Sequence, residues 1–263
     1  MGGPAAGAGS TEGSPRTAAP PRVGVLLSGR GSNFLALHAA IERGELPARI
    51  AVVVSDVPEA PGIARAAELG LPTARLPRRD FADRTAHETA ILAALAEHGV
   101  EWVCLAGFMR LLSPGFLRAY PQRVLNMHPS LLPAFPGLHP QQQALAHGVK
   151  VSGCTVHFVD EGVDSGPIVA QRAVPVLDGD DEAALAARIL AEEHRAYPEA
   201  LRRLLTEPWR VEERRVVFGV AAAESAQAAE PPSSSLAGER DDANQGGVAA
   251  ARSAVPVVQA LRG

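Results

Sequence analysis

Two polar residues, Asn126 and His128, stand at the end of an apolar run that predicts a β-strand, Val124 to Met127. They alternate across Met127, so on an extended chain both side chains point to one face. A histidine can act as an acid or a cation near neutral pH, and an amide N–H can donate to a developing oxyanion. The pair therefore suits carbonyl chemistry. A strand-end histidine satisfied by a backbone carbonyl explains the same residues, and the pair alone does not separate the two interpretations.

A second polar segment is the acidic loop that follows a predicted strand at Cys154 to Val159. Asp160, Glu161 and Asp164 crowd into a few residues there. A carboxylate beside His128 would orient the imidazole and raise the population of its protonated form. A solvated turn is the simpler interpretation of such a loop. No His or Cys recurs here with the spacing of metal ligands, so we expect no metal.

The third segment is the turn SGRGSN, residues 28–33, between a predicted strand at Val23 to Leu27 and a predicted helix. Unsatisfied N–H groups at a helix N-terminus favour anions, and glycine lets a phosphate approach closely. The turn lacks the Lys of GxxxxGK[ST] and the third Gly of GxGxxG, so it predicts neither a nucleotide triphosphatase nor a dinucleotide enzyme. Alternatively, the turn is a plain connection in which Ser32 or Asn33 caps the helix.

The segment from Ala106 to Leu112 follows another strand end and is either core or the wall of a pocket for a flat aromatic ligand. Its position favours the wall. His139 could line the pocket as well. The remaining histidines that we considered are expected to be structural or exposed: His38, His87, His98, His147 and His157.

These segments need a scaffold that brings strand ends together. Short β-branched runs alternate with helical patterns, which predicts a Rossmann-like α/β fold: an open, mostly parallel sheet with helices on both faces. Further strands are expected at residues 50–54, 103–106 and 168–173, and a last one at 211–218. Helices are expected at about residues 34–41, 62–69, 81–98 and 181–205, the last interrupted near Pro198.

Composition limits the class of protein. The 263 residues are 46% hydrophobic and carry a formal charge of -4, which offers no polycationic surface for nucleic acid. No stretch approaches the ~20 apolar residues of a membrane helix, so we expect a cytoplasmic protein. Its two cysteines are too few for a disulfide framework or a four-cysteine zinc site, and both are expected in the core. Residues 1–20 and 221–263 are expected to be a disordered leader and tail around one domain, 21–220.

Together, the motifs SGRGSN, LAGFMRLLSP, LNMHPSLLPAFPGLH and GCTVHFVDEGVDSGP resemble the phosphoribosylglycinamide formyltransferases, the folate-dependent glycinamide ribonucleotide transformylases of purine synthesis. The resemblance runs from about Val23 to Trp209. The Asn-x-His and HPSLLP elements are shared by the wider formyl-transferring superfamily, whereas the SGxGSN turn is more particular to this branch.

The resemblance implies roles for particular residues. Asn126, His128 and Asp164 would be catalytic. Glycinamide ribonucleotide would be held by Gly31, Ser32, Asn33 and Glu193. The folate pocket would comprise Arg84, Met109, Arg110, Leu111, Leu112 and Asn126, with Asp160, Glu161, Gly162, Val163 and Asp164.

The implied reaction moves the formyl group of 10-formyltetrahydrofolate, an organic cosubstrate, to the amine of glycinamide ribonucleotide, with no metal. Asn126 and protonated His128 would stabilise the oxyanion, and Asp164 would position His128. The partners would then be small molecules, with no nucleic acid or membrane, and the enzyme a monomer or homodimer. Rivals with the same chemistry are a formyltetrahydrofolate hydrolase, a sugar-amine formyltransferase and a methionyl-tRNA formyltransferase; a non-enzymatic folate-binding or nucleotide-binding module is a rival of another class.

Overall fold

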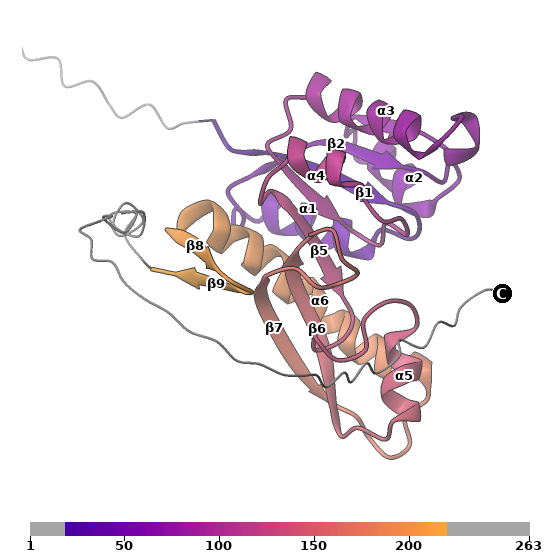
Figure 1. The fold of residues 1–263 in the computed structure, drawn as a ribbon, viewed down its shortest axis with the longest axis vertical. Helices are drawn as coiled ribbons and strands as arrows, with labels where there is room; N and C mark the ends of the chain where they lie inside the picture. Colours follow the sequence, from indigo (N-terminus) through magenta and orange to yellow (C-terminus); the bar gives the residue numbers. More distant parts are fainter. Residues whose placement is uncertain (1–18, 220–263) are drawn as a thin grey trace, which may run out of the picture. The chain divides into compact units, whose positions relative to one another are not determined.

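A nine-stranded sheet runs through residues 19–219, the part of the chain that the computed structural model describes (Figure 1). The strand order is β3-β2-β1-β4-β5-β6-β7-β9-β8. The strands are β1 (Arg22–Leu27), β2 (Arg49–Ser55), β3 (Thr73–Arg75), β4 (Trp102–Leu105), β5 (Val124–His128), β6 (Val151–Phe158), β7 (Ile168–Pro175), β8 (Trp209–Glu212) and β9 (Arg215–Phe218). Strands β3 to β5 in this order are all parallel, whereas β6 runs antiparallel to both β5 and β7.

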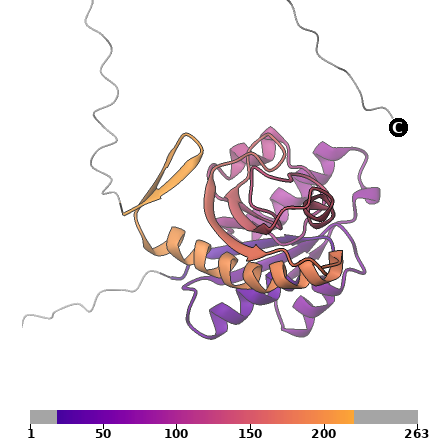
Figure 2. The same cartoon turned by 90° about the horizontal axis from the view of Figure 1, so that it is seen from below.

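Helices cover both faces of the sheet. They are α1 (Ser32–Glu42), α2 (Pro61–Glu68), α3 (Arg84–Glu97), α4 (Pro114–Ala119), α5 (Pro140–Ala146) and α6 (Glu182–Thr206), with a 3₁₀ turn η1 (Arg78–Asp80). One apolar cluster joins the sheet to α1, α2 and α6, and a second joins its other face to α3 and α4. Figure 2 shows α6 running along the sheet. The predicted fold class, a mostly parallel α/β sheet with helices on both faces, is confirmed.

Strand alternation builds the two clusters. On β1, Val23, Val25 and Leu27 enter the cluster with α1 and α6, while Leu26 enters the cluster with α3. Each of these side chains is almost fully buried, and such burial contributes about 1.5–3 kcal/mol per side chain. The same alternation on β5 leaves Asn126 and His128 facing away from the first cluster. The sheet is therefore what fixes the direction of these two side chains.

Three sequence predictions are corrected. The strand expected at 211–218 is a hairpin of β8 and β9, because Glu213 takes a left-handed φ of 53° and turns the chain without glycine. Pro198 does not interrupt α6, because buried residues on both sides of it, such as Leu185 and Leu201, hold the helix against the sheet. The long helix expected from residue 81 begins at Arg84, where the preceding Asp83 side chain accepts the Ala86 N–H at 2.8 Å.

The described residues, 19–219, nearly coincide with the predicted domain, 21–220. The predicted leader, residues 1–20, lies outside the described residues except for its last two positions, and the predicted tail, 221–263, lies outside them entirely. The chain divides into residues 1–222 and residues 223–263, and only the first unit contains described residues. None of the helices in residues 19–219 is both long and apolar enough to cross a membrane. Cys104 and Cys154 are buried free thiols, as expected.

Candidate active site

Asn126 and His128 lie on β5, the last parallel strand before the sheet turns antiparallel. The antiparallel register of β5 and β6 places His157 opposite Asn126 and Thr155 opposite His128. Directly opposed residues share one face of a sheet. As a result, the Asn126 amide lies 3.2 Å from Nε2 of His157, and the side chains of His128 and His157 are both nearly buried. Two imidazoles and one amide thus meet at this strand end.

Asp164 joins this group from the acidic loop between β6 and β7. Its Oδ2 lies 3.2 Å from Nδ1 of His128 and accepts the Gly137 N–H at 2.8 Å. Its Oδ1 lies 3.4 Å from Nδ2 of Asn126 and 3.6 Å from Nε2 of His157. The backbone of Asp164 takes a left-handed φ of 50°, which residues other than glycine rarely adopt. The loop therefore holds the carboxylate against the β5 residues by several independent contacts.

The hydrogen bonds define the state of each ring. Nε2 of His128 donates to the Phe135 carbonyl at 2.9 Å, so Nδ1 is the atom that faces Asp164. Nδ1 of His157 donates to the Phe158 carbonyl at 2.9 Å, which leaves Nε2 to accept from the Asn126 amide. A proton added to His128 therefore goes to Nδ1, between the imidazole and the carboxylate.

Burial controls the charge of this pair. It lowers the pKa of His128 by desolvation, more than the Phe135 carbonyl and the Asp164 charge raise it. Burial acts to raise the pKa of Asp164, but the neighbouring His157 ring, the Gly137 N–H and the His128 ring together outweigh it, so the pKa is lowered. Asp164 acts on His128 in the expected direction, yet the net shift opposes protonation. The predicted effect of a carboxylate beside His128 is therefore present, but desolvation is the larger effect on the pKa of the imidazole.

The glycine turn connects β1 to α1. Gly31 precedes α1 with a left-handed φ of 70°, and no side chain caps the helix. The alternative that Ser32 or Asn33 serves as a cap does not hold, because both lie inside the helix. Gly62 packs on the turn, where an added Cβ would come within 2.9 Å of the Gly29 carbonyl. The first N–H groups of α1 are thus left without a side-chain acceptor, as an anion site requires.

Asn33 and Glu193, 160 residues apart in sequence, meet beside this turn. Nδ2 of Asn33 donates to Oε2 of Glu193 at 2.7 Å, and both side chains are buried. Burial raises the pKa of Glu193, and the Asn33 hydrogen bond opposes this rise only in part. The Oδ1 atom of Asn33 is buried and has no hydrogen-bond partner in the described residues. The structure thus places two of the predicted substrate residues in direct contact.

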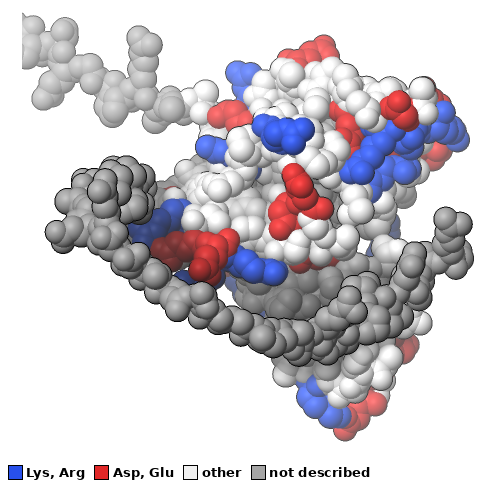
Figure 3. Space-filling view, in the orientation of Figure 1, with Lys and Arg blue, Asp and Glu red and all other residues white. Residues whose placement is uncertain are grey.

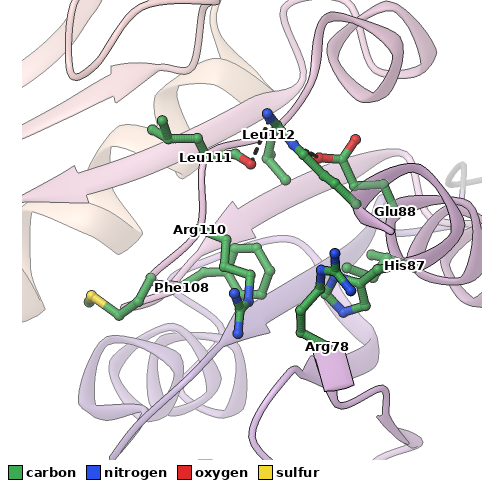
Figure 4. A pocket seen from close by; sticks show the side chains of 10 residues that line it. Arg78, His87, Glu88, Phe108, Arg110, Leu111 and Leu112 are labelled. Carbon is green, nitrogen blue, oxygen red and sulfur yellow. Dashed lines mark hydrogen bonds and ion pairs between the residues drawn. The ribbon is translucent and has the colours of Figure 1, made fainter. Parts of the chain in front are cut away.

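A pocket of about 330 Å³ opens between α3 and the loop that follows β4 (Figure 4). Its guanidinium groups come from Arg78, Arg84 and Arg110. Arg84 donates to Glu88 at 2.9 Å and to the Leu111 carbonyl at 2.9 Å, so it ties α3 to the loop. The full lining is Arg78, Arg84, His87, Glu88, Ile91, Phe108, Met109, Arg110, Leu111 and Leu112. Of the segment at 106–112, residues 108–112 line the pocket as its position predicted, whereas Ala106 is part of the apolar core.

The predicted folate residues fall into two groups in the structure, apart from Asn126, which lies on β5 and does not line the pocket. Arg84 and residues 109–112 line the pocket. Residues 160–164 do not line it but form the loop that carries Asp164 to His128, closed by the Asp160 carboxylate, which accepts from Ser165 at 2.7 Å. His139 does not line the pocket either; it precedes α5 with a φ of 56°.

Sequence reasoning missed several residues of these sites. The sequence predicts a structural or exposed His157 because the residue lies in mid-strand, and only the β5–β6 register shows it beside Asn126. Arg78 and Glu88 line the pocket without having been singled out, although Glu88 follows Arg84 at the i, i+4 helical spacing. Among residues 19–219, no three His, Cys, Asp or Glu side chains are grouped so as to hold a metal ion.

Comparison with known proteins identifies the family. Residues 21–201 match the family model described as formyl transferase. The chain belongs to the formyl transferase family. It is 49% identical over 189 residues to phosphoribosylglycinamide formyltransferase of Mycobacterium tuberculosis (strain CDC 1551 / Oshkosh). The aligned region covers 72% of this chain and 86% of that protein. The branch that the motifs predicted is confirmed by this relative.

Other relatives agree. The crystal structure of glycinamide ribonucleotide transformylase 1 from Symbiobacterium toebii is 50% identical, with a TM-score of 0.76 over 80% of this formyl transferase and 99% of that chain. The trifunctional purine biosynthetic protein adenosine-3 of Drosophila pseudoobscura pseudoobscura is 50% identical over 182 residues. That match covers 68% of this chain but only 13% of the trifunctional protein.

Proposed function

We propose that this formyl transferase moves the formyl group of 10-formyltetrahydrofolate to the primary amine of glycinamide ribonucleotide. The observation that carries the proposal is the meeting of Asn126, His128 and Asp164 at the carboxyl end of β5. The relatives named phosphoribosylglycinamide formyltransferase support the choice of acceptor. The enzyme would be a one-carbon transferase of purine biosynthesis.

The sheet brings the glycine turn, the pocket wall and the Asn126–His128 pair to one edge. Leu105 of β4 is the register partner of Asn126, and the pocket wall at 108–112 follows β4 directly after Ala106 and Gly107. Leu26 of β1 pairs with Leu105 on the other side, and the glycine turn follows β1. The carboxyl ends of β1, β4 and β5 are thus neighbours. A ligand at this edge, outside the strand ends, is typical of open α/β sheets.

The pocket suits a folate. Its volume of about 330 Å³ lies within the usual range for small-molecule sites. The Phe108 ring and the aliphatic chains of residues 109–112 offer apolar contact for a flat ring system. Arginine side chains match the carboxylates of a folate. Figure 3 shows Lys and Arg side chains gathered on the side of α2 and α3, although the whole chain has a negative formal charge.

The nucleotide would bind at the other end of the same edge. The free N–H groups of α1, with Gly31, Ser32 and Asn33, would hold the ribose phosphate. Glu193 would accept from a hydroxyl or amine of the same substrate, and the unpartnered Oδ1 of Asn33 would gain a donor. Residues 160–164 would complete the folate side through the loop backbone.

The proposed chemistry is direct transfer. The amine attacks the formyl carbon, the carbonyl oxygen becomes an oxyanion, and the bond from that carbon to N10 of the folate then breaks as a proton from the amine reaches N10. Asn126 would stabilise the oxyanion, since its 3.4 Å contact with Asp164 is long and easily exchanged. The proton that leaves the attacking amine would be held at Nδ1 of His128, beside the Asp164 carboxylate, before it reaches N10, so that His128 is cationic while the oxyanion exists.

An acceptor test decides the function. Purified protein should consume 10-formyltetrahydrofolate only when glycinamide ribonucleotide is present, with one formylated product per tetrahydrofolate released. Equal turnover without the acceptor would indicate a hydrolase and refute the proposal. Turnover that requires an amino sugar or methionyl-tRNA instead would reassign the acceptor. Binding of both ligands with no turnover would indicate a binding module.

The cell location and assembly belong to the same proposal. We expect the enzyme in the cytoplasm, where it would act on small molecules without metal, nucleic acid or membrane, as a monomer or homodimer. Fractionation of cells and light scattering after size exclusion would test these expectations. A membrane-bound fraction, or a mass above that of two chains, would contradict them.

A further inference from the structure

A buried carboxylate outside the proposed catalytic group joins three neighbouring strand ends. Asp56 directly follows β2, and its side chain is only 2% exposed. Its Oδ1 accepts from the Ser28 hydroxyl at 2.5 Å, and its Oδ2 accepts from Nε of Arg110 at 2.5 Å. Ser28 follows β1, and Arg110 lies in the loop after β4. Because β2, β1 and β4 are adjacent in the sheet, one carboxylate can reach both segments.

Ser28 extends this connection into the pocket wall. Its hydroxyl oxygen accepts the Met109 N–H at 3.0 Å while the hydroxyl donates to Asp56. Its backbone N–H donates to the Gly107 carbonyl at 3.0 Å. Gly107 takes a left-handed φ of 76°, which glycine adopts without strain. Two hydrogen bonds therefore fix the loop at residues 107–110 to the end of β1, and Asp56 adds an indirect link between Ser28 and Arg110.

The charge of Asp56 makes these contacts demanding. Burying a carboxylate costs folding free energy unless the group is paired and hydrogen-bonded. Removing one of its partners leaves a buried charge uncompensated. The hydrogen-bond partners found for Asp56 within residues 19–219 are Ser28 and Arg110. Ser28 immediately precedes the glycine turn, whereas Arg110 is one of the guanidinium groups in the pocket. The two partners thus belong to the two proposed binding elements.

We propose that Asp56 is a positioning residue that couples the nucleotide turn to the folate pocket. It holds the glycine turn through Ser28 and the pocket wall through Arg110, so that both substrates meet in a fixed relation. This inference rests on the proposed function. It assigns Asp56 no contact with either substrate.

The test replaces Asp56 by its neutral isostere. Both partners of Asp56 are hydrogen-bond donors, and the side-chain amide of Asp56→Asn has only one acceptor oxygen. It can therefore accept from one partner, while its own N–H group faces the donor of the other. We expect the KM values for 10-formyltetrahydrofolate and for glycinamide ribonucleotide to rise together by about tenfold, the loss of one charge-assisted hydrogen bond. The kcat should stay within about threefold of the wild type, because Asp56 does not touch the reacting atoms.

A matched control is Asp178→Asn. Asp178 also forms an ion pair, with Lys150 at 2.5 Å, but its side chain is 90% exposed. Such a surface pair contributes little, so the control should keep both KM values. Ser28→Ala removes the connection without altering charge, and should raise both KM values even if Asp56→Asn folds poorly. Melting temperatures and active-site titration would accompany each measurement.

The outcomes separate the possibilities. If Asp56 were only structural, its loss would lower the melting temperature and the active fraction while both KM values stayed unchanged, which would overturn the inference. A rise confined to one KM would overturn the coupling as well. Inactive wild type and inactive Asp178→Asn would instead show that the proposed function is wrong, which is a different failure.

Discussion

Replacing Asp164 with asparagine should remove most of the activity while the fold remains intact. The amide keeps the size of the carboxylate and can still accept the Gly137 N–H. It cannot balance the charge of a proton held at Nδ1 of His128, which lies 3.2 Å from the carboxylate. Removing the negative charge also lowers the pKa of His128 further, because Asp164 is one of the groups that raise it. The cationic imidazole becomes harder to form when the oxyanion develops.

The geometry sets the size of the effect. Two unit charges 3.2 Å apart attract by about 5 kcal/mol at an effective dielectric constant of about 20, a ceiling of three to four orders of magnitude in rate. The side chains are 6% and 14% exposed, so solvent screens the pair little, but part of the attraction already offsets desolvation. We therefore expect kcat to fall by about 10²- to 10³-fold, as when a preorganised charge-stabilising group is lost elsewhere.

The assay is steady-state formation of tetrahydrofolate with glycinamide ribonucleotide as acceptor, together with folate binding by calorimetry. Asp164→Asn should bind the folate with an affinity close to the wild type, and Asp178→Asn should show wild-type values throughout. A kcat within about threefold of the wild type would refute the role of the pair. So would a loss of rate fully explained by weaker folate binding or by unfolding.

Three further outcomes follow from burial and charge. Because burial lowers the pKa of His128 below its usual value near 6.5, the unfolded chain binds more protons there, so the free energy of unfolding should fall as the pH drops from about 7 to 5. His128→Gln should flatten the dependence of melting temperature on pH, and an unchanged slope would contradict this account. Arg78→Gln should raise the KM for 10-formyltetrahydrofolate about threefold and leave the KM for the nucleotide unchanged, because Arg78 lines the pocket and has no carboxylate partner within residues 19–219. The control is the neighbouring, exposed Arg79→Gln, and equal effects of both would show a general charge effect. Tyr197→Phe should lower stability by about 1–2 kcal/mol without changing kcat, because its buried hydroxyl lies 3.0 Å from two carbonyl oxygens, one each on β4 and β5. Denaturant unfolding measures the loss, and a change below about 0.3 kcal/mol would contradict it.

Local patterns were enough for the framework of this protein. Alternation places Asn126 and His128 on one face of β5, because successive side chains of any strand point to opposite sides. The glycine turn between β1 and α1 is likewise a local feature, since the strand, the turn and the helix are contiguous. Local rules failed for Pro198, where packing of α6 on the sheet outweighs a lost hydrogen bond, and for the β8–β9 turn, which contains no glycine.

Contacts between distant segments needed the tertiary structure. The sequence suggested a carboxylate near His128, but the antiparallel register of β5 and β6 is what places His157 there as well, 31 residues from Asn126. Register depends on pairing across the whole sheet, which no local pattern specifies. Asp56 reaches Arg110 for the same reason, because only β1 lies between β2 and β4 in the sheet.

The pKa of His128 depends both on residue types, which the sequence specifies, and on burial, which only the tertiary structure provides. The sequence determined the residue types that can exchange a proton and the carboxylate that favours the cation. The tertiary structure decided the balance, because only folding buries the imidazole, and desolvation then outweighs the attraction of Asp164.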